Sequence, residues 1–273
     1  MSKTGRRLLS GVSTNVLVLG VVSMLTDMSS EMIYPILPLF LTAIGATGLM
    51  IGLIEGAAES TASLLKVFSA WYSDRYDRRK PFLLAGYGLS ALVKPALVLA
   101  TSPWQVFGIR ISERVGKGLR SAPRDALIAD CTAQASMGKS FGFHKSMDSA
   151  GAVLGVVAAL VVLALAASME ELEAYRLVFL IATIPAFVAV AVIVLFVREK
   201  ESCSRGAKGA FVKDMSKLGR EFWVLMAVVV TFYAGEISYA FFVLQGQASG
   251  LSDMTVIALY LLVGNIIAFT VGP

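Results

Sequence analysis

The stretch from Trp104 to Cys131 constrains the fold of this chain more than any other. It lies in a very apolar sequence, yet it carries the ionisable side chains Arg110, Glu113, Arg114, Lys117, Arg120, Arg124 and Asp125. On a helix, at about 100° per residue, these side chains fall within one arc of about 140°. Gly108, Ser112 and Gly116 repeat on the opposite face, where small residues let neighbouring helices approach closely. The stretch therefore predicts a helix with one packing face and one charged face.

Composition places that helix in a membrane. The 273 residues are 56% hydrophobic, with a mean hydropathy of +0.74. Apolar runs long enough to cross about 30 Å of hydrocarbon recur along the chain. These crossings should be helices, because strand-like alternation is absent and lipid offers the backbone no hydrogen-bond partner. We expect an all-α polytopic membrane protein in which ionisable groups face a protein interior or a wet cavity.

The apolar runs predict a six-helix bundle, a linker and the start of a second bundle. The first six spans are expected at about 15–41, 49–72, 81–100, 104–131, 139–167 and 175–197, so that residues 1–197 form the N-terminal transmembrane bundle. Pro35 and Pro38 should bend the outer end of the first span.

The segment 198–221, in which Lys and Arg outnumber the acids, reads as a cytoplasmic linker. Its latter part, 211–222, is typical of an amphipathic helix on the membrane surface. Residues 222–273 should then begin a second transmembrane bundle, with span seven at about 222–244 and span eight starting near Thr255.

Charged loops predict the orientation. Lys3, Arg6 and Arg7 precede the first span, which places the N-terminus in the cytoplasm by the positive-inside rule. Under this count every basic loop falls on that side, and the acidic loop 169–173 falls on the other. The net charge of +5 is interrupted by membrane spans, so it does not indicate a nucleic-acid surface. The expected location is the cytoplasmic (inner) cell membrane, with several passes.

Acids and bases occupy matching depths on different spans. At about 1.5 Å of rise per residue, Asp27, Glu59, Arg114 and Asp148 come out near the middle of the membrane, and Glu31, Glu55, Lys94 and Arg110 come out nearer the outside. This placement indicates ion pairs across a central cavity, with Arg114 and Asp27 as the expected core pair. A carboxylate in such a site can take up and release a proton as the cavity changes face.

Structural roles compete with these assignments. A buried ion pair can simply fix the register of two helices. For Arg124, near the cytoplasmic end, a structural or gating role is favoured over substrate contact, and for His144 a hydrogen-bonding role is favoured over a proton relay. Gly151 and Gly155 indicate helix packing. No metal-ligand cluster, phosphate loop or nucleophile–base arrangement stands out, so neither an enzyme nor a bound cofactor is predicted.

Three motifs resemble the major facilitator superfamily (MFS). The loop AWYSDRYDRR, residues 70–79, resembles the signature G-x-x-x-D-[RK]-x-G-[RK]-[RK], and Asp74, Arg75, Arg78 and Arg79 match it while Ala70 and Asp77 replace the glycines. In span four, RVGKG resembles R-x-x-Q-G, with Lys117 in place of glutamine and Gly118 as the helix-packing glycine. Span five is similar to the start of the antiporter signature G-x-x-x-G-P, with Val156 in the proline position.

The resemblance implies a twelve-helix transporter in two related halves, here truncated after eight spans. It implies that Arg114 serves proton coupling or substrate binding and that the loop of Asp74 controls the inward gate. The missing C-terminal helices or a second chain would then be needed for transport.

Proton-coupled export of a small organic compound by alternating access is the leading hypothesis, with protons, a small-molecule substrate and the lipid bilayer as partners. Asp27, Glu31, Glu55, Glu59, Arg110, Arg114 and Asp148 are the expected coupling and cavity residues. The alternatives are a symporter or uniporter for an anionic solute, and a non-transporting fragment or regulatory membrane protein.

Overall fold

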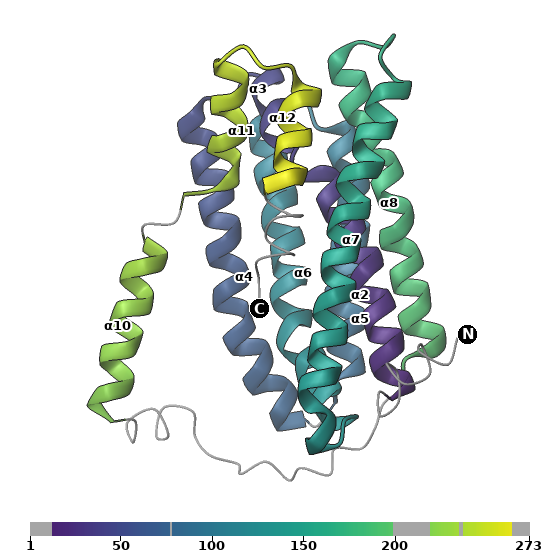
Figure 1. Ribbon diagram of the computed structural model, residues 1–273, viewed down its shortest axis with the longest axis vertical. Coiled ribbons are helices and arrows are strands. Elements are labelled where there is room, and N and C mark those ends of the chain that lie inside the picture. The colour runs from purple at the N-terminus through teal and green to yellow at the C-terminus, as the bar shows by residue number, and fades with distance from the viewer. Residues whose placement is uncertain (1–12, 77, 199–218, 235–236, 264–273) are drawn as a thin grey trace.

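The computed structural model describes residues 13–76, 78–198, 219–234 and 237–263, and over these ranges the chain is helical (Figure 1). The elements are α2 (Thr14–Ile33), α3 (Leu37–Ala43), α4 (Gly48–Tyr76), α5 (Lys80–Val93), the 3-10 helix η1 (Lys94–Leu99), α6 (Pro103–Asp130), η2 (Gln134–Ser136), α7 (Met137–Leu165), α8 (Glu171–Phe196), α10 (Arg220–Ala234), α11 (Tyr239–Ala248) and α12 (Asp253–Tyr260). The predicted all-α class is confirmed.

Four of the helical segments are long and apolar enough to cross a membrane: Thr14–Ala43, Lys80–Leu99, Gln134–Leu165 and Glu171–Phe196. Helices α4 and α6 have similar lengths, 29 and 28 residues, but carry the charged side chains. All six run side by side in one bundle (Figure 1). The chain is therefore a multi-pass membrane protein in which two charged helices are packed among apolar ones.

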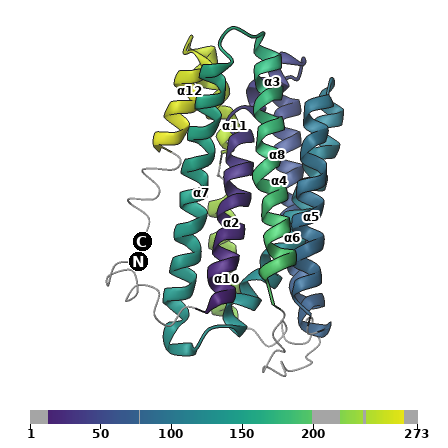
Figure 2. The same ribbon diagram turned by 90° about the vertical axis from the view of Figure 1, so that its right-hand side faces the viewer.

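Small residues set which helices touch. Figure 2 shows α2 between α7 and α8, and α6 packs on both α4 and α5. Gly151 on α7 lies so close to the backbone of Met24 that a side chain would collide with it, and Gly118 would meet Leu65 Cβ at 2.6 Å. Gly116 approaches Gly86 on α5 in the same way. These contacts place α2 against α7 and lock α6 between its two neighbours.

The small-residue stripe predicted on α6 packs only in part. A side chain on Gly108 would find nothing within 4 Å, and the Ser112 hydroxyl donates to the Gly108 carbonyl at 2.8 Å within its own helix. Of the three small residues, Gly116 makes the close contact with a neighbouring helix. The reason is that α5 gives way at Val93 to η1, so the regular helix of that neighbour ends before it reaches Gly108.

Two predicted spans are interrupted. The first is divided into α2 and α3 by a turn at Tyr34–Ile36, where Pro35 and then Pro38, in the first turn of α3, break the hydrogen-bond ladder. The predicted span 222–244 was wrong as one helix, because Ser238 caps a new helix, α11, by accepting a hydrogen bond from the Ala240 amide. Glu236 and most of the predicted linker and surface helix (211–222) lie outside the described residues.

Apolar cores occupy the two ends of the bundle. One contains Phe40 and Phe179 and lies at the end that carries Met169–Glu173, which we call the acidic end. The other contains Leu19 and Ile193 and lies at the end that carries the turn between α4 and α5, which we call the basic end. On α6 the buried charges fall between these cores, after Val106 of the first and before Leu127 of the second. Helices α11 and α12 pack on the acidic end against α3, α4 and α7, whereas α10 stands apart from the bundle (Figure 1).

Candidate functional site: the charged layer and its cavity

Arg110 on α6 is completely buried, and each nitrogen of its guanidinium donates a hydrogen bond to a carboxylate. Its Nε and Nη2 donate to the carboxylate of Glu55 on α4 at 2.9–3.1 Å, and its Nη1 donates to Glu113 Oε2 at 2.6 Å. Two carboxylates therefore neutralise one guanidinium, in the bidentate geometry that arginine favours. This group holds α4 against α6 in the middle of the bundle.

Lys94 extends the same network to three more elements. It lies at the start of η1, just before Pro95, and it is 1% exposed. Its Nζ donates to the hydroxyls of Ser29 at 2.6 Å and Ser30 at 3.1 Å and lies 3.9 Å from Glu113 Oε1. The Ser29 hydroxyl in turn donates to the Ala182 carbonyl on α8. The network contains two acids and two bases, so its charge is balanced.

Arg114, one turn after Arg110, has a different environment. It is 4% exposed, and its Nη1 lies 3.1 Å from Glu59 Oε2, while the Glu59 side chain is 56% exposed. Neither Nε nor Nη1 makes an aligned hydrogen bond. Both guanidinium groups make cation–π contacts with the ring of Tyr34. The Cζ atoms of Arg110 and Arg114 lie 4.9 and 5.1 Å from the ring centroid. Arg114 is thus held in place but not saturated.

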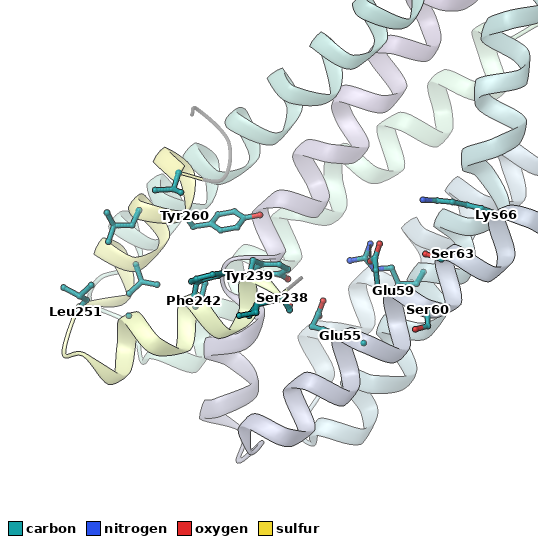
Figure 3. Close-up of a pocket in the computed structure, with 18 residues that line it drawn as sticks. Glu55, Glu59, Ser60, Ser63, Lys66, Ser238, Tyr239, Phe242, Leu251 and Tyr260 are labelled. Carbon is teal, nitrogen blue, oxygen red and sulfur yellow. Dashed lines mark ion pairs between the residues drawn. The ribbon is translucent and has the colours of Figure 1, made fainter. Parts of the chain in front are cut away.

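A cavity of about 1220 Å³ opens beside Arg114. Figure 3 shows its two walls, with Glu55, Glu59, Ser60, Ser63 and Lys66 on one side and Ser238, Tyr239, Phe242, Leu251 and Tyr260 on the other. The first wall is a polar stripe of α4, and the second is the largely apolar and aromatic surface of α11 and α12. A solute with both polar and apolar parts fits such a site.

Tyrosines of the cavity lining connect α11 and α12 to the bundle below its acidic end. The Tyr260 hydroxyl donates to Glu31 Oε2 at 2.9 Å, and the Tyr239 ring lies between those of Tyr34 and Tyr260, with centroids 6.0 and 5.6 Å away. Nearer that end of the bundle, the Tyr175 hydroxyl donates to the Asp253 carboxylate. These contacts join α11 and α12 to the six-helix bundle at one end only.

The expected pair of Arg114 with Asp27 is not formed, because Arg114 pairs with Glu59 instead. Helix α4 packs directly on α6 along much of its length, whereas α2 makes few contacts with α6, so Glu59 is the carboxylate within reach. Among the described residues Asp27 makes no ion pair within 4.0 Å. The charged groups that act on it are Asp148 and, from α6, Lys117, Arg120 and Arg124.

A second polar group lies nearer the basic end. Arg124 donates from Nε to Asp125 at 3.0 Å and from Nη1 to the Ser23 hydroxyl at 3.2 Å. His144 Nδ1 lies 3.6 Å from Asp148 Oδ1 on the same helix. Gly155, in the same stripe of α7, faces the backbone of Met28. This group joins α2, α6 and α7.

The loop that matches the first motif joins three elements. Arg79 Nη1 donates to Asp74 Oδ1 at 2.6 Å and to the Ser73 hydroxyl at 2.8 Å, and Arg79 Nε lies 3.5 Å from Asp130 Oδ2 at the end of α6. Arg75 stacks over the Trp71 ring at 5.4 Å, and Arg78 is exposed. The turn between α4 and α5 is thereby tied to α6 at the basic end.

Several residues of the site were not among the predicted ones. The tyrosines at 34, 239 and 260 were not predicted, and Lys94 and Glu113 were recognised only as buried charges. Tyr34 has a usable signal, because it follows Asp27 by seven residues and Glu31 by three and so shares their helix face. In the part of the chain that the structure describes, no three His, Cys, Asp or Glu side chains gather as a metal site.

Comparison with known proteins identifies the family. The profile of the Major Facilitator Superfamily matches residues 19–273. The MFS-type transporter MJ1317 of Methanocaldococcus jannaschii is 36% identical over 237 residues, which cover 86% of this chain and 57% of that protein. The multidrug resistance protein MdtH of Photorhabdus laumondii is 30% identical over 126 residues, which are 46% of this chain and 31% of that protein.

Solved structures agree with this assignment at the level of the fold. A bacterial homologue of the human lysosomal transporter Spinster, in an inward-facing and unoccupied conformation, matches with a TM-score of 0.61 at 18% identity, over 80% of this chain and 48% of that one. Tetrameric PepTSo2 matches with a TM-score of 0.62 at 11% identity, over 95% of this chain and 52% of that one. The chain spans about half the length of these proteins. Its helical bundle, its motifs and the match over nearly its whole length show that it belongs to the Major Facilitator Superfamily of transporters.

Proposed function

We propose that this protein carries out secondary active transport of a small organic solute by alternating access, coupled to protons. The observation that carries the proposal is the Glu59–Arg114 pair on the wall of the large cavity. A buried guanidinium with unused donors, beside a carboxylate that water can reach, is suited to exchanging partners. A purely structural pair would resemble Arg110, which is closed off on every side.

Protons enter this proposal through carboxyl groups that lack a locked counter-charge. Asp27 makes no ion pair within 4.0 Å among the described residues, and Glu31 accepts a hydrogen bond from the Tyr260 hydroxyl of the second half. A carboxyl group in this position can bind a proton when the cavity faces one side and release it when the cavity faces the other.

The geometry also supports a direction for the conformational change. Helices α11 and α12 contact the bundle at the acidic end, which corresponds to a state closed there. We assign the basic end to the cytoplasm by the positive-inside rule, with the N-terminus on that side of the cytoplasmic membrane. The loop of Asp74, Arg75, Arg78 and Arg79, with Arg124 above it, then forms the cytoplasmic gate. We expect transport to need a complete second transmembrane half, supplied by further helices or by a second chain.

Export is the direction we favour, because the partial relative in Photorhabdus laumondii is named a multidrug resistance protein. The test uses everted membrane vesicles from cells that express the native gene, energised to an acidic interior. A panel of radiolabelled organic acids and cationic dyes is screened for uptake that a protonophore abolishes. We expect Asp27→Asn and Arg114→Ala to abolish gradient-driven uptake of the transported compound.

Wild-type rates in either variant would refute the proposal, as would transport that is indifferent to the protonophore. Uptake of an anionic solute together with protons is the second candidate, since Arg114 is an unsaturated cation in the cavity. It predicts that the same compound accumulates in right-side-out vesicles when the outside is made acidic. Export predicts accumulation in the everted vesicles instead.

A further inference from the structure

Arg110 and Arg114, one turn apart on α6, differ in the number of partners they hold. Arg110 has three of its nitrogens bonded to two carboxylates and is sealed from water. Arg114 is nearly as buried, yet its Nε and Nη1 lack an aligned acceptor, and its one ion-pair partner, Glu59, is half exposed. A buried guanidinium left with unused donors carries a desolvation penalty that a better acceptor would remove. Arg114 is therefore suited to exchanging Glu59 for another anionic partner.

We propose that the transported solute carries a carboxylate that binds Arg114 in place of Glu59. The guanidinium lines the cavity, and the ring of Tyr34 stacks on its face. A planar fork of this kind binds a carboxylate through two parallel hydrogen bonds, a geometry that a lysine cannot offer. The displaced Glu59 side chain turns to the water that already reaches it.

The rest of the cavity indicates what the carboxylate is attached to. Ser60, Ser63 and Lys66 continue the polar stripe along α4 and supply further donors. The facing wall presents Phe242 and Leu259, together with other apolar side chains of α11 and α12. A compact organic acid with an apolar or aromatic body satisfies both walls at once.

This inference rests on the proposed function, because it takes the cavity to be the transport site, and binding tests it separately from transport. The full chain is purified in detergent, and binding of 4-phenylbutyrate and 3-phenylpropionate is compared with that of their amides by isothermal titration. The amides keep the size and apolar body but lose the charge. We expect the acids to bind at least about tenfold more tightly than the amides, as for loss of a charged hydrogen bond.

Two variants with opposite expected effects make the test specific. Arg114→Lys keeps the charge but loses the fork, so acid binding should weaken at least about tenfold toward that of the amide. Glu59→Gln removes the competing carboxylate, so acid binding should strengthen several-fold while amide binding stays the same. Leu64→Met, at an exposed position of α4 that does not line the cavity, is the matched control and should change neither.

Equal binding of acids and amides would overturn the inference, as would weaker acid binding in Glu59→Gln or no acid binding by the wild-type chain. Each of these results would leave the proposed function standing if the vesicles still show gradient-driven transport of a cationic dye. Loss of all gradient-driven transport, with acid binding intact, would refute the function and keep the carboxylate site.

Discussion

Replacing Arg110 by Met tests the structural half of the charged layer. The substitution keeps the length and apolar stem of the side chain but removes the guanidinium. Glu55 and Glu113, which are 7% and 6% exposed, then lose their shared counter-charge. Removing one partner of a buried ion pair typically destabilises a protein by about 3–5 kcal/mol, because the remaining charge is stranded away from water. Lys94 stays 3.9 Å from Glu113, so Glu55 is the carboxylate left without a counter-charge, and the expected loss lies within this range.

The same substitution at Arg114 gives the matched comparison. Its partner, Glu59, is 56% exposed and keeps its hydration when the guanidinium is removed. The loss should be about 1 kcal/mol or less, as for a solvent-accessible pair. Arg110 should therefore stabilise the fold, whereas Arg114, one turn later on the same helix, should contribute little to stability and serve transport.

Thermal unfolding of the purified chain in detergent measures the difference. At about 2–4 °C per kcal/mol for a chain of this size, Arg110→Met should lower the melting temperature by roughly 6–20 °C, and Arg114→Met by less than about 4 °C. Adding Glu55→Gln to Arg110→Met should recover much of the loss, because the remaining buried acid, Glu113, keeps Lys94 as its counter-charge. Equal melting temperatures for the two methionine variants would refute the division of roles.

Three further outcomes follow from the packing and the gates. Gly151→Val should push α7 from α2 and cost about 1–3 kcal/mol of stability, measured by thermal unfolding, whereas Gly108→Val, with nothing within 4 Å, should change it little. Tyr260→Phe removes the hydrogen bond to Glu31, which is worth about 1 kcal/mol. The population of molecules open at the acidic end should rise about fivefold, as measured by electron–electron distances between spin labels on α4 and α12. Arg79→Gln should slow transport several-fold with little change in solute affinity, because the gate loses its ties to α4 and α6; an unchanged rate would contradict this role.

Much of the fold was predictable because membrane spans depend on local composition. Length, hydropathy and the prolines define the apolar spans, and the alignment of charges on α6 implies a polar interior. The interruption of the span after residue 222 was less accessible. Its signals are a single capping serine, Ser238, and a glycine before it in an otherwise apolar run.

Which residues belong to the site was easier to predict than which of them form ion pairs with one another. Depth along each helix placed Asp27, Glu59 and Arg114 at one level, but depth says nothing of which helices are neighbours. That choice is made by glycine contacts such as Gly118 with Leu65, which bring α4 onto α6 and give Arg114 to Glu59. Arg110 and Arg114 are equivalent in the sequence pattern. Only the tertiary structure shows that one is saturated and the other is not.

The central claim is that the polar face of α4 is exposed to water in the cavity, while adjacent residues of the same helix are exposed to lipid. Neighbouring positions on α4 test it directly: Ser63 lines the cavity, and Leu64 is 64% exposed on the outer surface of the helix. Ser63→Cys and Leu64→Cys are made in a chain whose native cysteines are replaced by serine, and a charged, membrane-impermeant thiol reagent is applied in native membranes. Because only a hydrated thiol forms the reactive thiolate, Ser63→Cys should react at least about tenfold faster than Leu64→Cys. Equal rates, or faster reaction of Leu64→Cys, would contradict the account.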